Sequence, residues 1–253
     1  MLKIKQLFNI NYHSYTYIIF SSTTSTGIII DPIIEDVDKY IQLISELNIN
    51  LYYIFETHLH ADHITGAALL SKKNNNCPIV MGYETSANNV DIFISDDQEI
   101  SIYDITIKAI HTPGHTHDSY CYLIKSYLFT GDTLLIRKTG RSDLQEGSAR
   151  DQYQSIKNKL FTLPASTIIY PGHDYLGNTT SSIGEEFKYN TQISHNNEDD
   201  YIKLKESLEL SPPTLMHKNL SANKTCGYDL ILKGIDEKIT PPSKKIFDLF
   251  KLQ

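Results

Sequence analysis

The ten residues THLHADHITG, numbers 57–66, hold three histidines and an aspartate within six positions and follow the apolar run Tyr52–Phe55. In an extended chain, residues two apart point to the same side, so His58 and His60 should project together from a strand end. We expect Asp62 and His63 to lie in the first turn of a following helix, with Asp62 as its N-cap. This one segment therefore predicts ligands for two adjacent metal positions.

Further short motifs place His or Asp directly after an expected strand: HTPGHTHDS (111–119), GDT (131–133) and PGHDY (171–175). They contribute His115, Asp132 and His173, together with His117. Taken singly, such residues are ordinary surface histidines, turn aspartates or helix caps. Their recurrence at successive strand ends is not explained in that way, because clustered charged groups are costly to bury without a ligand. The pattern predicts a metal centre built from loops at one sheet edge.

The remaining hydrophobic pattern predicts an α/β protein in which helices cover a sheet. Expected strands lie in the N-terminal 20 residues and at 27–30, 52–55, 78–81, 99–110, 120–124, 127–130 and 167–170, and expected helices at 36–47, 64–73 and 148–160. Beyond about Gly184, helical patterns at 185–192 and 199–210 are followed by Pro-containing coil. We expect a catalytic domain over residues 1–183, with 184–253 as a C-terminal helical extension packed on it.

Composition excludes several classes of protein. The 253 residues carry a formal net charge of −7 without a Lys/Arg-rich run, which disfavours nucleic-acid binding. No apolar run approaches the ~20 residues that span a bilayer, so no membrane association is expected. Three widely spaced cysteines, Cys77, Cys121 and Cys226, argue against a disulfide framework and favour a reducing compartment. We therefore expect a cytoplasmic protein.

The four motifs THLHADHITG, HTPGHTHDS, FTGDTLL and YPGHDY resemble, in order, those of the metallo-β-lactamase superfamily. The resemblance implies an αββα sandwich, with two mixed sheets face to face, helices outside and the metal at one edge. It assigns His58, His60 and His115 to a first metal position. Asp62, His63 and His173 then belong to a second position, and Asp132 lies between the two.

Three further stretches resemble the persulfide dioxygenase family: LLIRKTGRSDLQEG (134–147), residues 168–186, and NLSANKTCG (219–227). This resemblance implies oxidation of glutathione persulfide by O2 and water to glutathione and sulfite, at one mononuclear Fe(II) per chain. Iron would be held by His58, His115 and Asp132, a two-histidine, one-carboxylate set with open positions. His60, Asp62, His63 and His173 would line the cavity or form a second site. A homodimer is the family expectation.

The motif GRSD supplies Arg141 and Asp143, which we expect to brace the active-site loop or contact substrate; an ordinary surface ion pair is the alternative. Tyr175 is either a hydroxyl donor to substrate or a rim aromatic. Arg137 and Lys138 offer positive charge for glutathione carboxylates, although an exposed basic pair often has no specific role.

Two residues have open roles. Cys226 lies in the late motif and is more typical of a buried, inert thiol than of a substrate contact. His117 is either close to the metal site or exposed.

The main alternative function is a glyoxalase II-type hydroxyacylglutathione hydrolase, which would use two metals. All second-site ligands are present, so the ligand set does not exclude it; the GRSDLQ segment favours the dioxygenase. A catalytically silent sensor or binding module is a third alternative, but such a chain should have lost ligands.

Overall fold

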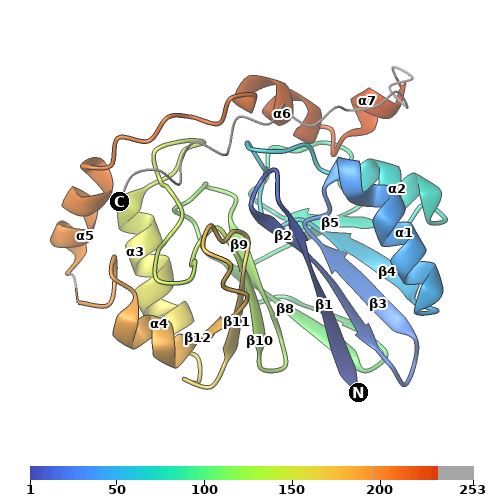
Figure 1. The fold of residues 1–253 in the computed structure, drawn as a ribbon, viewed down its shortest axis with the longest axis horizontal. Helices are drawn as coiled ribbons and strands as arrows, with labels where there is room; N and C mark the ends of the chain where they lie inside the picture. The colour runs from blue at the N-terminus through green and yellow to red at the C-terminus, as the bar shows by residue number, and fades with distance from the viewer. Residues whose placement is uncertain (196, 233–253) are drawn as a thin grey trace.

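Two six-stranded sheets form the centre of the computed structural model, which describes residues 1–195 and 197–232 (Figure 1). The first sheet has the order β1-β2-β3-β4-β5-β6 and the second β12-β11-β10-β9-β8-β7. The strands are β1 Leu2–Asn9, β2 Ser14–Ser21, β3 Thr26–Ile30, β4 Asn50–Phe55, β5 Ile79–Gly82, β6 Ile92–Ile94, β7 Glu99–Ile102, β8 Ile105–His111, β9 Tyr120–Ile124, β10 Tyr127–Gly131, β11 Ile168–Pro171 and β12 Ser181–Ser182. The helices are α1 Val37–Glu46, α2 Ala67–Lys73, α3 Ala149–Asn158, α4 Ile183–Tyr189, α5 Glu198–Glu206, α6 Met216–Asn223 and α7 Tyr228–Leu232.

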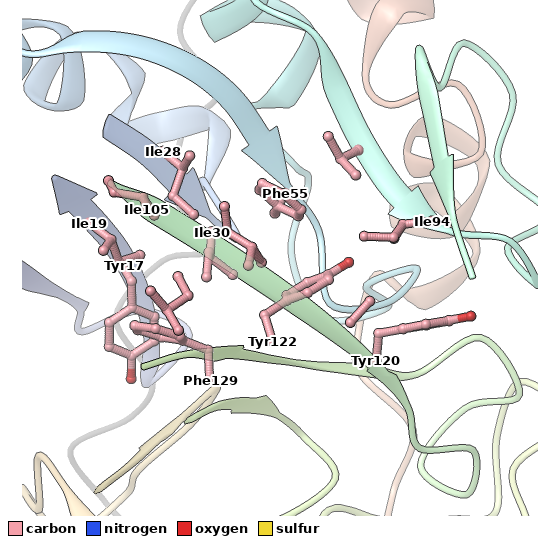
Figure 2. Packing of buried hydrophobic residues seen from close by; sticks show 14 of the residues in the cluster. Tyr17, Ile19, Ile28, Ile30, Phe55, Ile94, Ile105, Tyr120, Tyr122 and Phe129 are labelled. Atoms are coloured by element: carbon pink, nitrogen blue, oxygen red, sulfur yellow. The ribbon is translucent and has the colours of Figure 1, made fainter. Parts of the chain in front are cut away.

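Strand β2 shows that both faces of the first sheet are covered, because all eight of its residues are buried. Tyr17 and Ile19 point into the core between the sheets, where they meet Phe129 of the second sheet (Figure 2). The alternate residue Ile18 lies in a separate core that includes side chains of α1 and α2. A third core joins the second sheet to α3, α4 and α5. The order helix, sheet, sheet, helix confirms the predicted αββα sandwich.

The strand register brings the loops that carry the predicted ligands to one edge of the sheets. In the second sheet β10 and β11 run parallel, with Gly131 opposite Pro171. Asp132 and His173 therefore leave neighbouring strands at the same end. A hydrogen bond from Tyr120 N to Thr57 O, 2.8 Å long, joins the loop after β4 to the start of β9.

The predicted N-cap role of Asp62 is wrong. Helix α2 begins at Ala67 with Gly66 as its N-cap, so Asp62 and His63 precede it in a bent segment. The segment is held by tertiary bonds, because Thr65 N donates to Asn223 Oδ1 at 2.9 Å. The Asp62 carboxylate instead lies beside histidines.

The C-terminal region contains more helix than expected. Helices α6 and α7 occupy residues predicted as coil, and the segment joining α5 to α6 runs along the top of the molecule in Figure 1. Residues 233–253 of the expected extension lie outside the described part of the chain. Within the described residues, no helix has the length and apolar character needed to cross a bilayer.

Candidate metal centre

Three predicted ligands from three separate strand ends come together: His58 after β4, His115 after β8 and Asp132 after β10. Each offers a ligand atom, and these atoms lie within 4.8 Å of one another. His115 Nε2 is 3.5 Å from Asp132 Oδ2. The two histidine rings pack edge to face with centroids 4.8 Å apart. The fold thus gathers residues that are far apart in sequence into one set of nitrogen and oxygen donors.

Hydrogen bonds fix which ring nitrogen of each histidine is free. His115 Nδ1 donates to the carbonyl oxygen of Arg141 at 2.7 Å, so in the neutral tautomer Nε2, which faces Asp132, is the nitrogen with a free lone pair. Thr57 Oγ1 donates to Asp31 Oδ2 at 2.8 Å. The same oxygen can therefore accept from His58 Nδ1, 3.0 Å away, so that Nε2 of His58 also carries a free lone pair.

His58 is held in the neutral form that metals bind. Burial, together with the neighbouring His60 and His115, holds the pKa of His58 well below its usual value. A neutral imidazole at neutral pH needs no proton removed before it can coordinate a metal.

Glycines allow the loops to approach Asp132 closely. A Cβ at Gly172 would lie 2.5 Å from Asp132 Oδ1, and one at Gly140 would lie 2.0 Å from the Asp132 carbonyl oxygen. Both distances are shorter than any van der Waals contact. The glycines of PGH and TGR are therefore required by the packing around this carboxylate.

A second set of donors lies next to the first. Ligand atoms of His60, Asp62 and His63 lie within 4.8 Å of one another. His173 Nε2 is 3.5 Å from both Asp62 Oδ2 and Asp132 Oδ2. Burial alone would raise the pKa of Asp62, but His63 and His173 outweigh it and hold that pKa well below its usual value. Asp132 lies between the two sets, because its Oδ2 is 3.5 Å from Nε2 of both His115 and His173.

His60 also faces two carboxylates that were not anticipated from the sequence. Its Nε2 lies 3.2 Å from Asp31 Oδ1 and 3.2 Å from Glu56 Oε2. Burial lowers the pKa of His60, and the two carboxylates more than reverse this effect. Asp31 directly follows β3, in IIIDP, and Glu56 directly follows β4, in IFETH. A search for His, Asp or Glu directly after each expected strand would have identified both.

Buried polar atoms without partners indicate that a ligand completes the centre. Within the described residues, His60 Nδ1, His63 Nε2 and Asp132 Oδ1 are buried and make no hydrogen bond. Leaving such atoms unpaired costs about 1–3 kcal/mol each. The donor set and these orphaned atoms fit a divalent metal ion.

The centre opens into a cavity of about 490 Å³. His58, His115 and Asp132 line it, together with Tyr175 and Lys205. Its wall also includes residues 208, 210, 211 and 213, which follow α5. The cavity has the size of a small-molecule site.

Arg141 links two walls of this cavity. Its Nε and Nη2 donate to the two carboxylate oxygens of Asp143 at 2.8 and 2.7 Å. Its guanidinium also donates to the carbonyl oxygens of Leu210, at 3.1 Å, and Ser211, at 2.8 Å. These hydrogen bonds join the loop at residues 141–143 to the segment that follows α5, as expected of a residue that braces the loop.

The other predicted residues divide between wall and exterior. Tyr175 lines the cavity and stacks on His173, with centroids 6.0 Å apart. Lys138 is exposed at the rim, whereas Arg137 pairs with Glu185 at 3.0 Å and also with Glu186.

His117 and Cys226 lie off the cavity. The side chain of His117 is exposed. Cys226 is buried, and burial raises the pKa of its thiol to about 12. An inert thiol fits this environment.

Two asparagines of the late motif hold the ligand loop, a role that sequence reasoning missed. Asn223 Nδ2 donates to the carbonyl oxygens of His60 and His63, both at 2.8 Å. Asn219 Nδ2 donates to Ala61 O at 3.0 Å. Their spacing of four residues, one helical turn, was the available signal.

Comparisons with known proteins identify the family of this chain. The Metallo-beta-lactamase superfamily matches residues 11–91 and 78–173. The mitochondrial persulfide dioxygenase ETHE1 of Mus musculus is 35% identical over 242 residues, covering 95% of this chain and 91% of the mouse protein. A probable hydroxyacylglutathione hydrolase of Schizosaccharomyces pombe is 34% identical over a shorter 168 residues, 64% of each chain. The crystal structure of ETHE1 from Myxococcus xanthus superposes with a TM-score of 0.86 at 37% identity, covering 89% of this chain and 99% of that one. The chain therefore belongs to the persulfide dioxygenase family of the metallo-β-lactamase superfamily.

Proposed function

We propose that this protein oxidises glutathione persulfide: GSSH, O2 and H2O give GSH and sulfite with its two protons. The sulfane sulfur loses four electrons, which O2 accepts, so the reaction needs no other oxidant. The observation that carries the proposal is the convergence of His58, His115 and Asp132, which all line one cavity and whose ligand atoms lie within 4.8 Å of one another. The family relationship extends over nearly the whole chain, including the segments that line that cavity.

We assign His58, His115 and Asp132 as ligands of a single Fe(II). Bound iron would supply the redox chemistry and leave coordination positions free, since these residues fill three. The chain's own residues orient the donors: Arg141 O holds His115, and Thr57 holds His58. The cavity walls would bring the persulfide to the centre and restrict access of water.

Oxygen uptake and sulfite formation on glutathione persulfide test this function, with S-lactoylglutathione as the alternative substrate. We expect rapid oxygen uptake, an equal amount of sulfite and little thioester hydrolysis. His115→Ala should abolish both uptake and iron content. The matched control is His117→Ala, two residues away and exposed, which should retain both. Hydrolysis of S-lactoylglutathione without oxygen uptake would contradict the proposal.

One observation favours a second candidate, a hydroxyacylglutathione hydrolase. His60, Asp62 and His63 form a complete second donor set beside the first. A dinuclear hydrolase would bind two metals per chain, whereas our proposal requires one iron. Metal content of protein purified without added metal separates the two.

We also propose that the protein is cytoplasmic. The three cysteines are buried free thiols, which suits a cytoplasmic protein. We also propose a homodimer, which light scattering would test.

A further inference from the structure

Lys205 is a buried cation on the cavity wall. It lies near the end of α5 and is 8% exposed, yet it lines the same cavity as the proposed iron ligands. Its ammonium group donates to Gly140 O at 2.5 Å and to Thr139 Oγ1 at 3.2 Å. An ammonium group has three donors, so one N–H remains for a further acceptor.

Lys205 has no ion-pair partner among residues 1–195 and 197–232. The nearest acidic influence is Asp143, whose carboxylate is already bound by both donors of Arg141. Burial lowers the pKa of Lys205 to about 8, Asp143 opposes this and Arg141 adds to it. At neutral pH the group is still mainly charged, so the folded chain carries a buried charge that has the Tyr201 ring beside it, at 5.9 Å, but no carboxylate partner in the described part of the chain. Such a charge is costly to stability and is typical of a ligand site.

The other cations near the cavity are less suited to bind a ligand deep inside it. Arg141 uses four of its five N–H donors on Asp143 and two carbonyl oxygens, and its charge is already paired with the Asp143 carboxylate. Arg137 is paired with Glu185 and Glu186, and Lys138 is exposed at the rim. Glutathione persulfide carries carboxylate groups, and a charged hydrogen bond is the strongest means of binding one.

We propose that Lys205 binds a carboxylate of the thiol part of the substrate and thereby selects acidic persulfides. This inference rests on the proposed function and adds a specificity-determining residue to it. Lys205 would contact the non-reacting end of the substrate, so it should affect substrate binding more than turnover.

The test compares Lys205→Met with Lys205→Arg and with Lys203→Met, which removes an exposed lysine of the same helix. The substrates are glutathione persulfide and the persulfide of glutathione diethyl ester, which has the same frame without free carboxylates. For Lys205→Met we expect KM for the acid to rise about 10- to 100-fold, with kcat within about threefold. KM for the diester should be unchanged. Lys205→Arg should recover part of the affinity, and Lys203→Met should behave as the wild type.

A purely structural role gives a different result. If Lys205→Met lowers kcat equally for acid and diester, or leaves KM for the acid unchanged, the inference is wrong. Calorimetric binding of reduced glutathione provides a readout that does not need turnover, and its Kd should weaken by the same factor. Absence of oxygen uptake by the wild type would defeat the proposed function, while the calorimetry would still decide the role of Lys205.

Discussion

Replacement of Arg141 by Met should both destabilise the protein and loosen its metal centre. The guanidinium makes two bonds to Asp143 and two to the carbonyl oxygens of Leu210 and Ser211. The ion pair is partly exposed, at 16% for Arg141 and 54% for Asp143, so we assign it only about 1 kcal/mol. The two bonds to carbonyl oxygens contribute about 1 kcal/mol each. Together the loss is about 3 kcal/mol, or about 6–12 °C in Tm for a chain of this size.

The effect on the metal follows from the backbone of the same residue. Arg141 O accepts the hydrogen bond that orients His115, so movement of this loop should weaken metal affinity about 10- to 100-fold. Urea unfolding of the metal-free protein measures the first effect, and competition with a chelator measures the second. Arg150→Met is the matched control, because its pair with Glu198 joins two surface side chains and should contribute about 0.5 kcal/mol. Equal stability of the two variants, with unchanged metal affinity, would refute the bracing role.

Three further outcomes are expected. Gly172→Ala should fold poorly or lose metal, because the added Cβ would lie 2.5 Å from Asp132 Oδ1. Metal analysis of the purified variant checks this, and a variant with a full metal content would contradict it. Lys205→Met should gain stability at pH 7, since the wild type keeps a charge whose pKa falls from 10.5 to about 8 on folding. That pKa shift lowers the free energy of unfolding of the wild type by at most about 3 kcal/mol. The variant avoids this cost but loses two hydrogen bonds worth about 2 kcal/mol, so its net gain in stability is about 1 kcal/mol. Between pH 8 and 10.5 the unfolded wild type binds more protons than the folded protein, so the stability of the wild type should rise with pH relative to that of the variant. The stability advantage of the variant should therefore disappear by about pH 9.5. Urea unfolding at pH 7 and at about pH 9.5 measures this, and an advantage that grows with pH would refute it. The three cysteines should resist alkylation in the native protein, because all are buried with thiol pKa values raised to about 12; rapid labelling before unfolding would disprove this.

The fold and the donor sets were predictable because they depend on local patterns. Alternating or continuous apolar runs identified the main strands, and the strand-end position of each His and Asp motif placed the centre at one edge. His115 and Asp132 meet because β8 and β10 end on the same side of one sheet.

Features that depend on tertiary contacts were not predictable in the same way. Asp62 is a residue type favoured as a helix N-cap and precedes a helical pattern, but its carboxylate lies beside His63 and His173 in the centre. Lys205 lies in an ordinary amphipathic pattern, and only the packing of α5 against residues 139 and 140 turns it toward the cavity. The short strand β6 and the short helix α7 have too few residues to produce a clear periodic signal.

X-ray absorption of the iron-loaded protein, combined with its metal content, tests the central assignment most directly. We predict one iron per chain, with two imidazole ligands and one carboxylate. Replacing His58 should abolish iron binding, as expected for His115→Ala, whereas replacing His63 should leave the iron content and the iron's protein ligands unchanged. Two metals per chain, or loss of an iron ligand on substitution of His63, would contradict a mononuclear centre built by His58, His115 and Asp132.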